Sequence, residues 1–122
     1  MNIGIVTGEY PPMKGGVGDY TRILALHLTT NNHKVQVITD QRCLHPKNYA
    51  DEHEVIANIS RRWSWLDLWR IRKTTSDLDI LCIQYQAAAY GSMSIPIHFL
   101  PYITIPPTVT TFHDLEQPYL FP

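Results

Sequence analysis

Residues 7–21 read TGEYPPMKGGVGDYT, and this stretch decides the fold class. The apolar run 3–6 leads into it as a buried strand, and an amphipathic helical pattern leaves it at residue 17. Two prolines, then Lys14 and the pair Gly15-Gly16, separate strand from helix. Glycine lets a ligand approach bare N–H groups, and the helix directs the positive end of its dipole at the loop. The stretch therefore predicts a loop that binds a phosphate or a sugar hydroxyl.

Strand and helix patterns alternate along the rest of the chain. The predicted strands are 2–7, 34–39, 54–59, 79–85 and 108–112, and the predicted helices are 17–30, 64–75 and a short one within 95–104, with loops at 41–53 and 86–94. Alternation of this kind predicts a Rossmann-like parallel sheet in the order 3-2-1-4-5, with helices on both faces. The residues expected to pack on the sheet are Val17, Tyr20, Ile23, Leu24 and Leu28 of the first helix and Trp65, Leu68, Trp69 and Ile71 of the second.

Composition limits the possible partners. The 122 residues suffice for one domain, 44% are apolar, and ten basic residues balance eleven acidic ones, which gives no sign of a nucleic-acid binder. Cys43 and Cys82 have no zinc spacing and indicate free thiols in a reducing compartment, so a cytoplasmic protein is expected. No run reaches the ~18 apolar residues of a membrane span, and no signal peptide is visible. The histidines at 27, 33, 45, 53 and 98 have no metal-ligand spacing.

Polar clusters follow the predicted strands at one end only. They are Gly8 to Gly18, Asp40, Gln84 to Ser92, and His113-Asp114. In a sheet of this order the ligand crevice lies outside the carboxyl ends of the strands, where strand order reverses. A dinucleotide fingerprint is a competing interpretation, because Gly16-x-Gly18 precedes Asp40 by about twenty residues. Thr21 occupies its third glycine position, however, and the loop is too long for its tight turn.

The segments GEYPPMKGGVGDYTRILALHL and TFHDL resemble the N-terminal half of retaining glycosyltransferases of the GT-B fold. The most similar group is family 4, which includes sucrose-phosphate synthases and many bacterial mannosyl- and glucosyltransferases. The resemblance spans nearly the whole chain, although only the glycine loop and the His-Asp pair are specific. It implies transfer of a sugar from a nucleotide-sugar donor to a sugar, lipid or small-molecule acceptor, with retention and without a metal or other cofactor.

The resemblance also implies roles for single residues. Gly15 and Gly16 would approach the donor diphosphate or sugar, and His113 would reach the transferred sugar near the reacting centre. In the related starch and glycogen synthases a lysine stands two positions before the first glycine. Met13 occupies that position here, so Lys14 would reach a phosphate only as its neighbour. The residues expected to contact the acceptor, on the N-terminal side, are Gln84, Tyr85, Tyr90 and Asp114.

The C-terminal side of the predicted domain suggests that a further half is missing. The sequence stops soon after the fifth predicted strand, without a helix to cover it, so we expect the incomplete first half of a longer enzyme. The C-terminal half, which holds the donor through basic residues and paired glutamates in such families, would be missing, and the chain alone would show little turnover.

Two other functions remain open as alternatives to a glycosyltransferase. They are a noncatalytic nucleotide- or sugar-binding α/β module and a nucleotide-sugar epimerase.

The segment 61–73, RRWSWLDLWRIRK, concentrates five of the ten basic residues and all three tryptophans. A basic, aromatic helix can lie on an anionic membrane. The commoner outcome is a helix that packs its tryptophans on the sheet and leaves its arginines solvated. Both interpretations, a peripheral membrane contact and an ordinary sheet-packing helix, remain open at this point.

Overall fold

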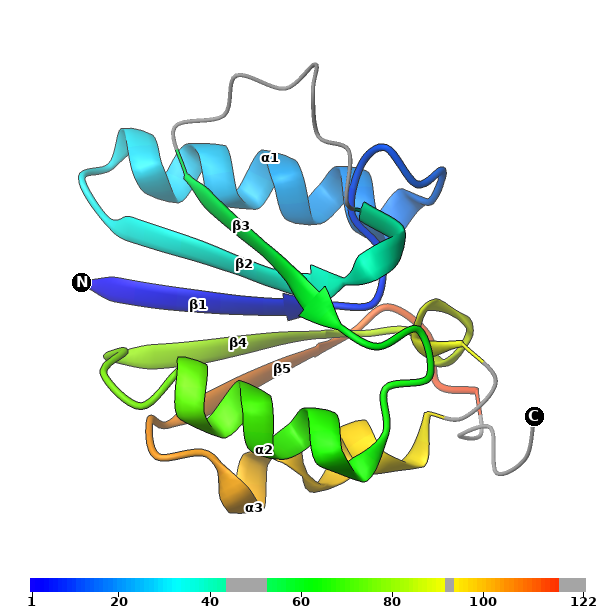
Figure 1. The fold of residues 1–122 in the computed structure, drawn as a ribbon. Coiled ribbons are helices and arrows are strands. Elements are labelled where there is room, and N and C mark those ends of the chain that lie inside the picture. The colour runs from blue at the N-terminus through cyan, green and yellow to red at the C-terminus, as the bar shows by residue number, and fades with distance from the viewer. Residues whose placement is uncertain (44–52, 92–93, 117–122) are drawn as a thin grey trace.

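The computed structural model describes residues 1–43, 53–91 and 94–116. Its strands are β1 (Asn2–Thr7), β2 (Lys34–Asp40), β3 (Glu54–Ile59), β4 (Ile80–Tyr85) and β5 (Thr108–Phe112). They form one parallel sheet in the order β3-β2-β1-β4-β5, which confirms the predicted order (Figure 1). The central strand β1 is buried from Ile3 to Thr7, as expected of a parallel strand covered on both faces.

Helices cover the two faces of the sheet unequally (Figure 1). α1 (Gly16–Thr30) lies on one face, and α2 (Trp65–Thr74) lies on the other beside α3 (Leu100–Ile103). The described residues also form three 3₁₀ turns, which are η1 (Gln41–Cys43), η2 (Ala87–Tyr90) and η3 (Ile95–Phe99). The single helix expected within 95–104 is thus a 3₁₀ turn followed by one α-helical turn. Pro101 has no N–H to continue an i→i−4 ladder, which accounts for the division.

The buried face of α1 differs from the predicted one. Tyr20 and Ile23 point outward, with 46% and 55% of their surfaces exposed, while Thr21 and Ala25 are fully buried against the sheet. Small side chains let the helix approach the strands closely. The buried Thr21 hydroxyl donates a hydrogen bond to the Val17 carbonyl at 2.7 Å, so it does not remain unpaired. The hydrophobic pattern favoured large residues and so placed Tyr20 and Ile23 wrongly. Leu24 and Leu28 are partly buried and pack on the core.

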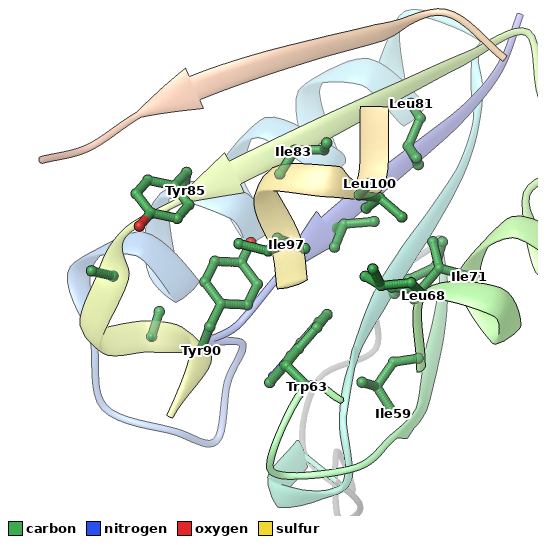
Figure 2. Close-up of a cluster of buried hydrophobic side chains, with 14 residues drawn as sticks. Ile59, Trp63, Leu68, Ile71, Leu81, Ile83, Tyr85, Tyr90, Ile97 and Leu100 are labelled. Carbon is green, nitrogen blue, oxygen red and sulfur yellow. The ribbon is translucent and has the colours of Figure 1, made fainter. Parts of the chain in front are cut away.

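The second helix is likewise rotated from the prediction. Trp65 and Trp69 are exposed (49% and 60%), and Leu68 and Ile71 face the sheet as expected. Trp63, just before α2, supplies the buried indole instead, with a positive φ of 48° and 1% exposure. Figure 2 shows it within the hydrophobic cluster, with Tyr90 on one side of the indole and Ile59 on the other.

Candidate functional site

The glycine loop and His113 lie at the same edge of the sheet. α1 begins where β1, β4 and β5 end, and His113 follows β5 directly (Figure 1). The His113 ring contacts the Tyr20 ring edge-on, with centroids 5.0 Å apart. Tyr20 is four residues, about one helical turn, after Gly16. The contact with Tyr20 places the His113 ring beside the first two turns of α1, at the edge of the sheet where the glycine loop lies.

Gln84 fixes the orientation of the imidazole. Gln84 Oε1 lies 2.8 Å from His113 Nε2, and Gln84 is 1% exposed. An amide oxygen only accepts hydrogen bonds, so Nε2 is the donor in this pair and Nδ1 faces away from Gln84. The His113 backbone N–H donates to the Tyr85 carbonyl at 2.8 Å, which extends the β5 ladder by one residue. Gln84 thus holds His113 in one orientation and has little surface for direct contact with an acceptor.

Glu9 lies against the N-terminus of α1. Its Oε2 atom lies against Gly15 and is buried with no hydrogen-bond partner among the described residues. Burial raises the pKa of Glu9, against the opposing effects of Arg42 and the Gly18 N–H. The Glu9 carboxylate therefore already occupies part of the space at the N-terminus of α1 where an anionic ligand would bind. The sequence signal was an acid shortly before a helix start, where negative charge is favourable.

The two glycines of the loop have different surroundings. A Cβ on Gly15 would overlap the Glu9 carboxylate, whereas a Cβ on Gly16 meets nothing within 4 Å. Gly15 has φ 176°, an extended conformation open to any residue, so Glu9 alone accounts for glycine there. Gly16 opens onto solvent, and a ligand can reach the first turn of α1 from that side.

We expect Gly15→Ala and Gly16→Ala to differ in stability. Gly15→Ala forces the Glu9 carboxylate away from the N-terminus of α1 and costs up to about 1 kcal/mol, the usual value of a favourable charge at that end of a helix. Gly16→Ala places alanine inside the first turn and is neutral or stabilising by up to about 1 kcal/mol. Urea denaturation measures both. Equal effects of the two substitutions would contradict the role given to Glu9.

An ion pair between Asp40 and Arg42 supports the glycine loop. Asp40, at the end of β2, is fully buried and binds Arg42 through both carboxylate oxygens at 2.5–3.0 Å. The same guanidinium donates to the carbonyls of Gly8 and Ala89, at 3.0 and 2.9 Å. Arg42 therefore connects the glycine loop to η2. Asp40 also accepts from the Trp63 indole N–H at 3.0 Å, so its oxygens are not available to a ribose, contrary to the dinucleotide interpretation.

A small cavity adjoins the end of β4 on the α2 side of the sheet. Its volume is about 130 Å³, and Tyr85, His98, Tyr102 and Phe112 contribute to its lining. Tyr85 Oη and His98 Nε2 are both buried and have no hydrogen-bond partner within the described ranges. Burial lowers the pKa of His98, which favours the neutral ring. Unpaired buried polar atoms beside a cavity are typical of a ligand site. His98 was dismissed from the sequence because its spacing gave no signal.

The remaining candidates take different positions. Lys14 is exposed and lies two residues before the start of α1. Asp114 is half-buried after β5, and its Oδ1 has no partner among the residues described. Tyr90 is fully buried, stacks on Tyr85, and donates its hydroxyl to the Gln84 carbonyl at 2.5 Å. Burial raises the pKa of Tyr90 far above its ordinary value. Tyr90 therefore supports β4 from the core, and this placement leaves no acceptor contact for it.

The sequence model described as Glycosyltransferase Family 4 matches residues 14–122. The chain belongs to glycosyltransferase family 4. The matched range includes Gly15, Gly16, Gln84 and His113, and Glu9 lies outside it. No curated protein and no solved structure matches the chain.

No group of three or more His, Cys, Asp or Glu side chains in residues 1–43, 53–91 and 94–116 could hold a metal ion. Across the same residues, no helix combines the length and apolar character that crossing a bilayer requires.

Proposed function

We propose that this family 4 chain is the acceptor-side domain of a GT-B glycosyltransferase. The reaction is transfer of a sugar from a nucleotide-sugar donor to a sugar, lipid or small-molecule acceptor, with retention of configuration and without a metal. The observation that carries the proposal is the shared edge, where Gly16 is open to solvent and His113 is held by Gln84. The free thiols Cys43 and Cys82 are consistent with a cytoplasmic enzyme.

The chemistry follows from charge development at that edge. Departure of a nucleoside diphosphate leaves negative charge on its oxygens, which backbone N–H groups and a helix dipole stabilise. Gly16 lets the diphosphate come close, and Lys14 adds a mobile positive charge. His113 Nδ1 accepts a hydrogen bond from a hydroxyl of the transferred sugar and fixes its position. Tyr85 and His98 offer polar atoms to the acceptor from the neighbouring cavity.

A nuclear magnetic resonance titration tests the shared edge directly. Inorganic diphosphate, UDP-glucose and GDP-mannose are added separately to isotope-labelled protein. We expect the Gly16 amide to shift with all three, and the His113 ring to shift only with the two nucleotide-sugars. Shifts confined to other elements, or no shifts, would contradict the proposal. A response to NAD⁺ alone would favour the epimerase, and binding without transfer by the longer enzyme would favour the noncatalytic module.

Gln84→Leu should weaken this response without unfolding the protein. Removing the Gln84 oxygen frees the imidazole, and loss of one such hydrogen bond corresponds to about tenfold weaker binding of the sugar. The measurement is the apparent Kd from the His113 ring signal. Gln36→Leu on β2 makes the same substitution away from this edge, at a residue that pairs with Glu54. A Gln84→Leu protein that binds as tightly as Gln36→Leu would refute the positioning role.

We also propose that the chain needs a second, nucleotide-binding unit for turnover. The edge described above offers N–H groups, Lys14 and His113 for the diphosphate and the sugar, and the neighbouring cavity of about 130 Å³ is assigned to the acceptor, which leaves the nucleoside to a second unit. Incubation of the chain with a radiolabelled nucleotide-sugar and simple acceptors should give no product. Detected sugar transfer would overturn this part of the proposal.

A further inference from the structure

The outward face of α2 carries a continuous stripe of apolar and basic side chains. We define the outer stripe as Arg62, Trp65, Leu66, Trp69, Arg70 and Lys73, and all six are exposed. The spacing of three and four residues among the five that lie on α2 places these five on one side of the helix, and Arg62 lies in the turn that precedes it. The opposite side packs into the core through Leu68 and Ile71. An outward face of this kind is unusual, because a sheet-covering helix normally turns polar and mixed-charge residues to solvent.

The stripe extends onto the neighbouring segment. The Trp65 ring contacts the Phe99 ring, with centroids 5.1 Å apart, and Phe99 is 48% exposed. Arg72 lies over the Trp69 ring at 5.9 Å and also donates to the Ile103 carbonyl, which connects α2 to α3. The exposed aromatic surface is therefore built on two packed elements.

The exposed charges of the outer stripe are all positive. Asp67 is the only acid in residues 61–73, all of which the structure describes, and it is 1% exposed. Although burial opposes it, hydrogen bonds from Ser60 and Ser64 lower the pKa of Asp67 and keep it ionised within the protein. The acids nearest in sequence, Asp77 and Asp79, come after the end of α2. On the other face of the sheet, α1 exposes Asp19 among its outward residues.

We propose that the outer stripe docks the protein on the surface of an anionic lipid bilayer. Indole rings favour the boundary between headgroups and acyl chains, and apolar side chains on a helix face enter it to a shallow depth. Lysine and arginine nearby are attracted to anionic headgroups. A stripe with tryptophan and leucine at its centre, basic residues along it and no exposed acid matches this surface in both respects. The first turn of α2 also lies at the end of the molecule where the strands end (Figure 1).

Vesicle sedimentation tests the proposal. The protein should pellet with vesicles of phosphatidylcholine and phosphatidylglycerol, and much less with phosphatidylcholine alone. Added salt should release it, because screening shortens the reach of exposed charges. Arg62→Gln/Arg70→Gln/Lys73→Gln should lower the partition coefficient roughly 100-fold, from about 1 kcal/mol for each cation. Trp65→Ala/Trp69→Ala should abolish pelleting in moderate salt.

Fluorescence supplies a second, independent measurement. Trp65 and Trp69 are exposed and Trp63 is buried, so brominated lipids should quench emission of the wild type and leave the Trp65→Ala/Trp69→Ala protein unquenched. Ile23→Ala/Lys34→Gln, which changes exposed residues outside α2, is the matched control and should bind as wild type. Circular dichroism verifies that each variant is folded. Absence of pelleting at low salt, salt-independent pelleting, or equal loss in the control would overturn the proposal; capture by single-stranded RNA in place of vesicles would do the same.

Discussion

Arg42→Ala should lower the free energy of unfolding by about 3 kcal/mol. Removing one partner of a buried ion pair leaves the other charge uncompensated, and Asp40 is fully buried. The guanidinium is 28% exposed, which places the expected cost at the lower end of the usual range. The Gly8 and Ala89 carbonyls lose their donor as well. Urea denaturation followed by circular dichroism measures the loss.

Arg70→Ala is the matched control for this substitution. Arg70 also pairs with a buried carboxylate, at 3.2 Å from Asp67, but its own side chain is 57% exposed. Asp67 keeps hydrogen bonds from Ser60 and Ser64 after the arginine is removed. We therefore expect a loss below about 1 kcal/mol, as for surface ion pairs. Similar losses in the two variants would show that Arg42 is not the brace described here.

Trp63→Ala should destabilise the protein by about 4 kcal/mol, the largest effect expected for a single substitution in this core. The indole is 1% exposed, meets the Tyr90 ring edge-on with centroids 4.8 Å apart, and donates to Asp40. Alanine leaves a large cavity and removes a donor from a buried carboxylate. Thermal and urea unfolding both report the change.

Trp63→Phe separates packing from hydrogen bonding. Phenylalanine keeps an aromatic ring against Tyr90 and loses the indole N–H, so a loss of about 2 kcal/mol is expected from the unpaired Asp40 oxygen and a smaller void. An equal loss in Trp63→Phe and Trp63→Ala would mean that packing of the ring contributes nothing. A loss below about 1 kcal/mol in Trp63→Ala would contradict the central place of this residue.

The sheet could be predicted because its signal is local. Runs such as DILCIQY and KVQVIT are rich in β-branched and other apolar residues, and their alternation with helical patterns leaves few topologies. The orientation of the helices could not be predicted as well, because it depends on how closely each helix approaches the strands. Thr21 and Ala25 are buried for that reason, and the larger Tyr20 is turned out. Periodicity ranks side chains by hydrophobicity and contains no information on that distance.

The candidate site was predictable at the level of segments. Gly16 and His113 are brought to one edge because strands β1 and β5 both end there. The contacts between side chains required the folded chain: Glu9 returns to the start of α1, and Arg42 reaches Ala89 across 47 residues of sequence. For Tyr90, the sequence predicted a loop residue whose hydroxyl contacts the acceptor. In the structure, that hydroxyl lies inside the core and donates to the Gln84 carbonyl.

The position of Glu9 at the start of α1 implies that binding of a phosphorylated ligand is coupled to proton uptake by this carboxylate. A phosphorylated ligand arriving at Gly16 would approach Glu9, whose pKa burial has already raised. A second negative charge nearby raises that pKa further, so the carboxyl group takes up a proton as the ligand arrives. Calorimetric heats measured in buffers of different ionisation enthalpy should therefore diverge in mildly acidic solution and coincide for Glu9→Gln. The loop would then hold phosphorylated ligands more tightly on acidification.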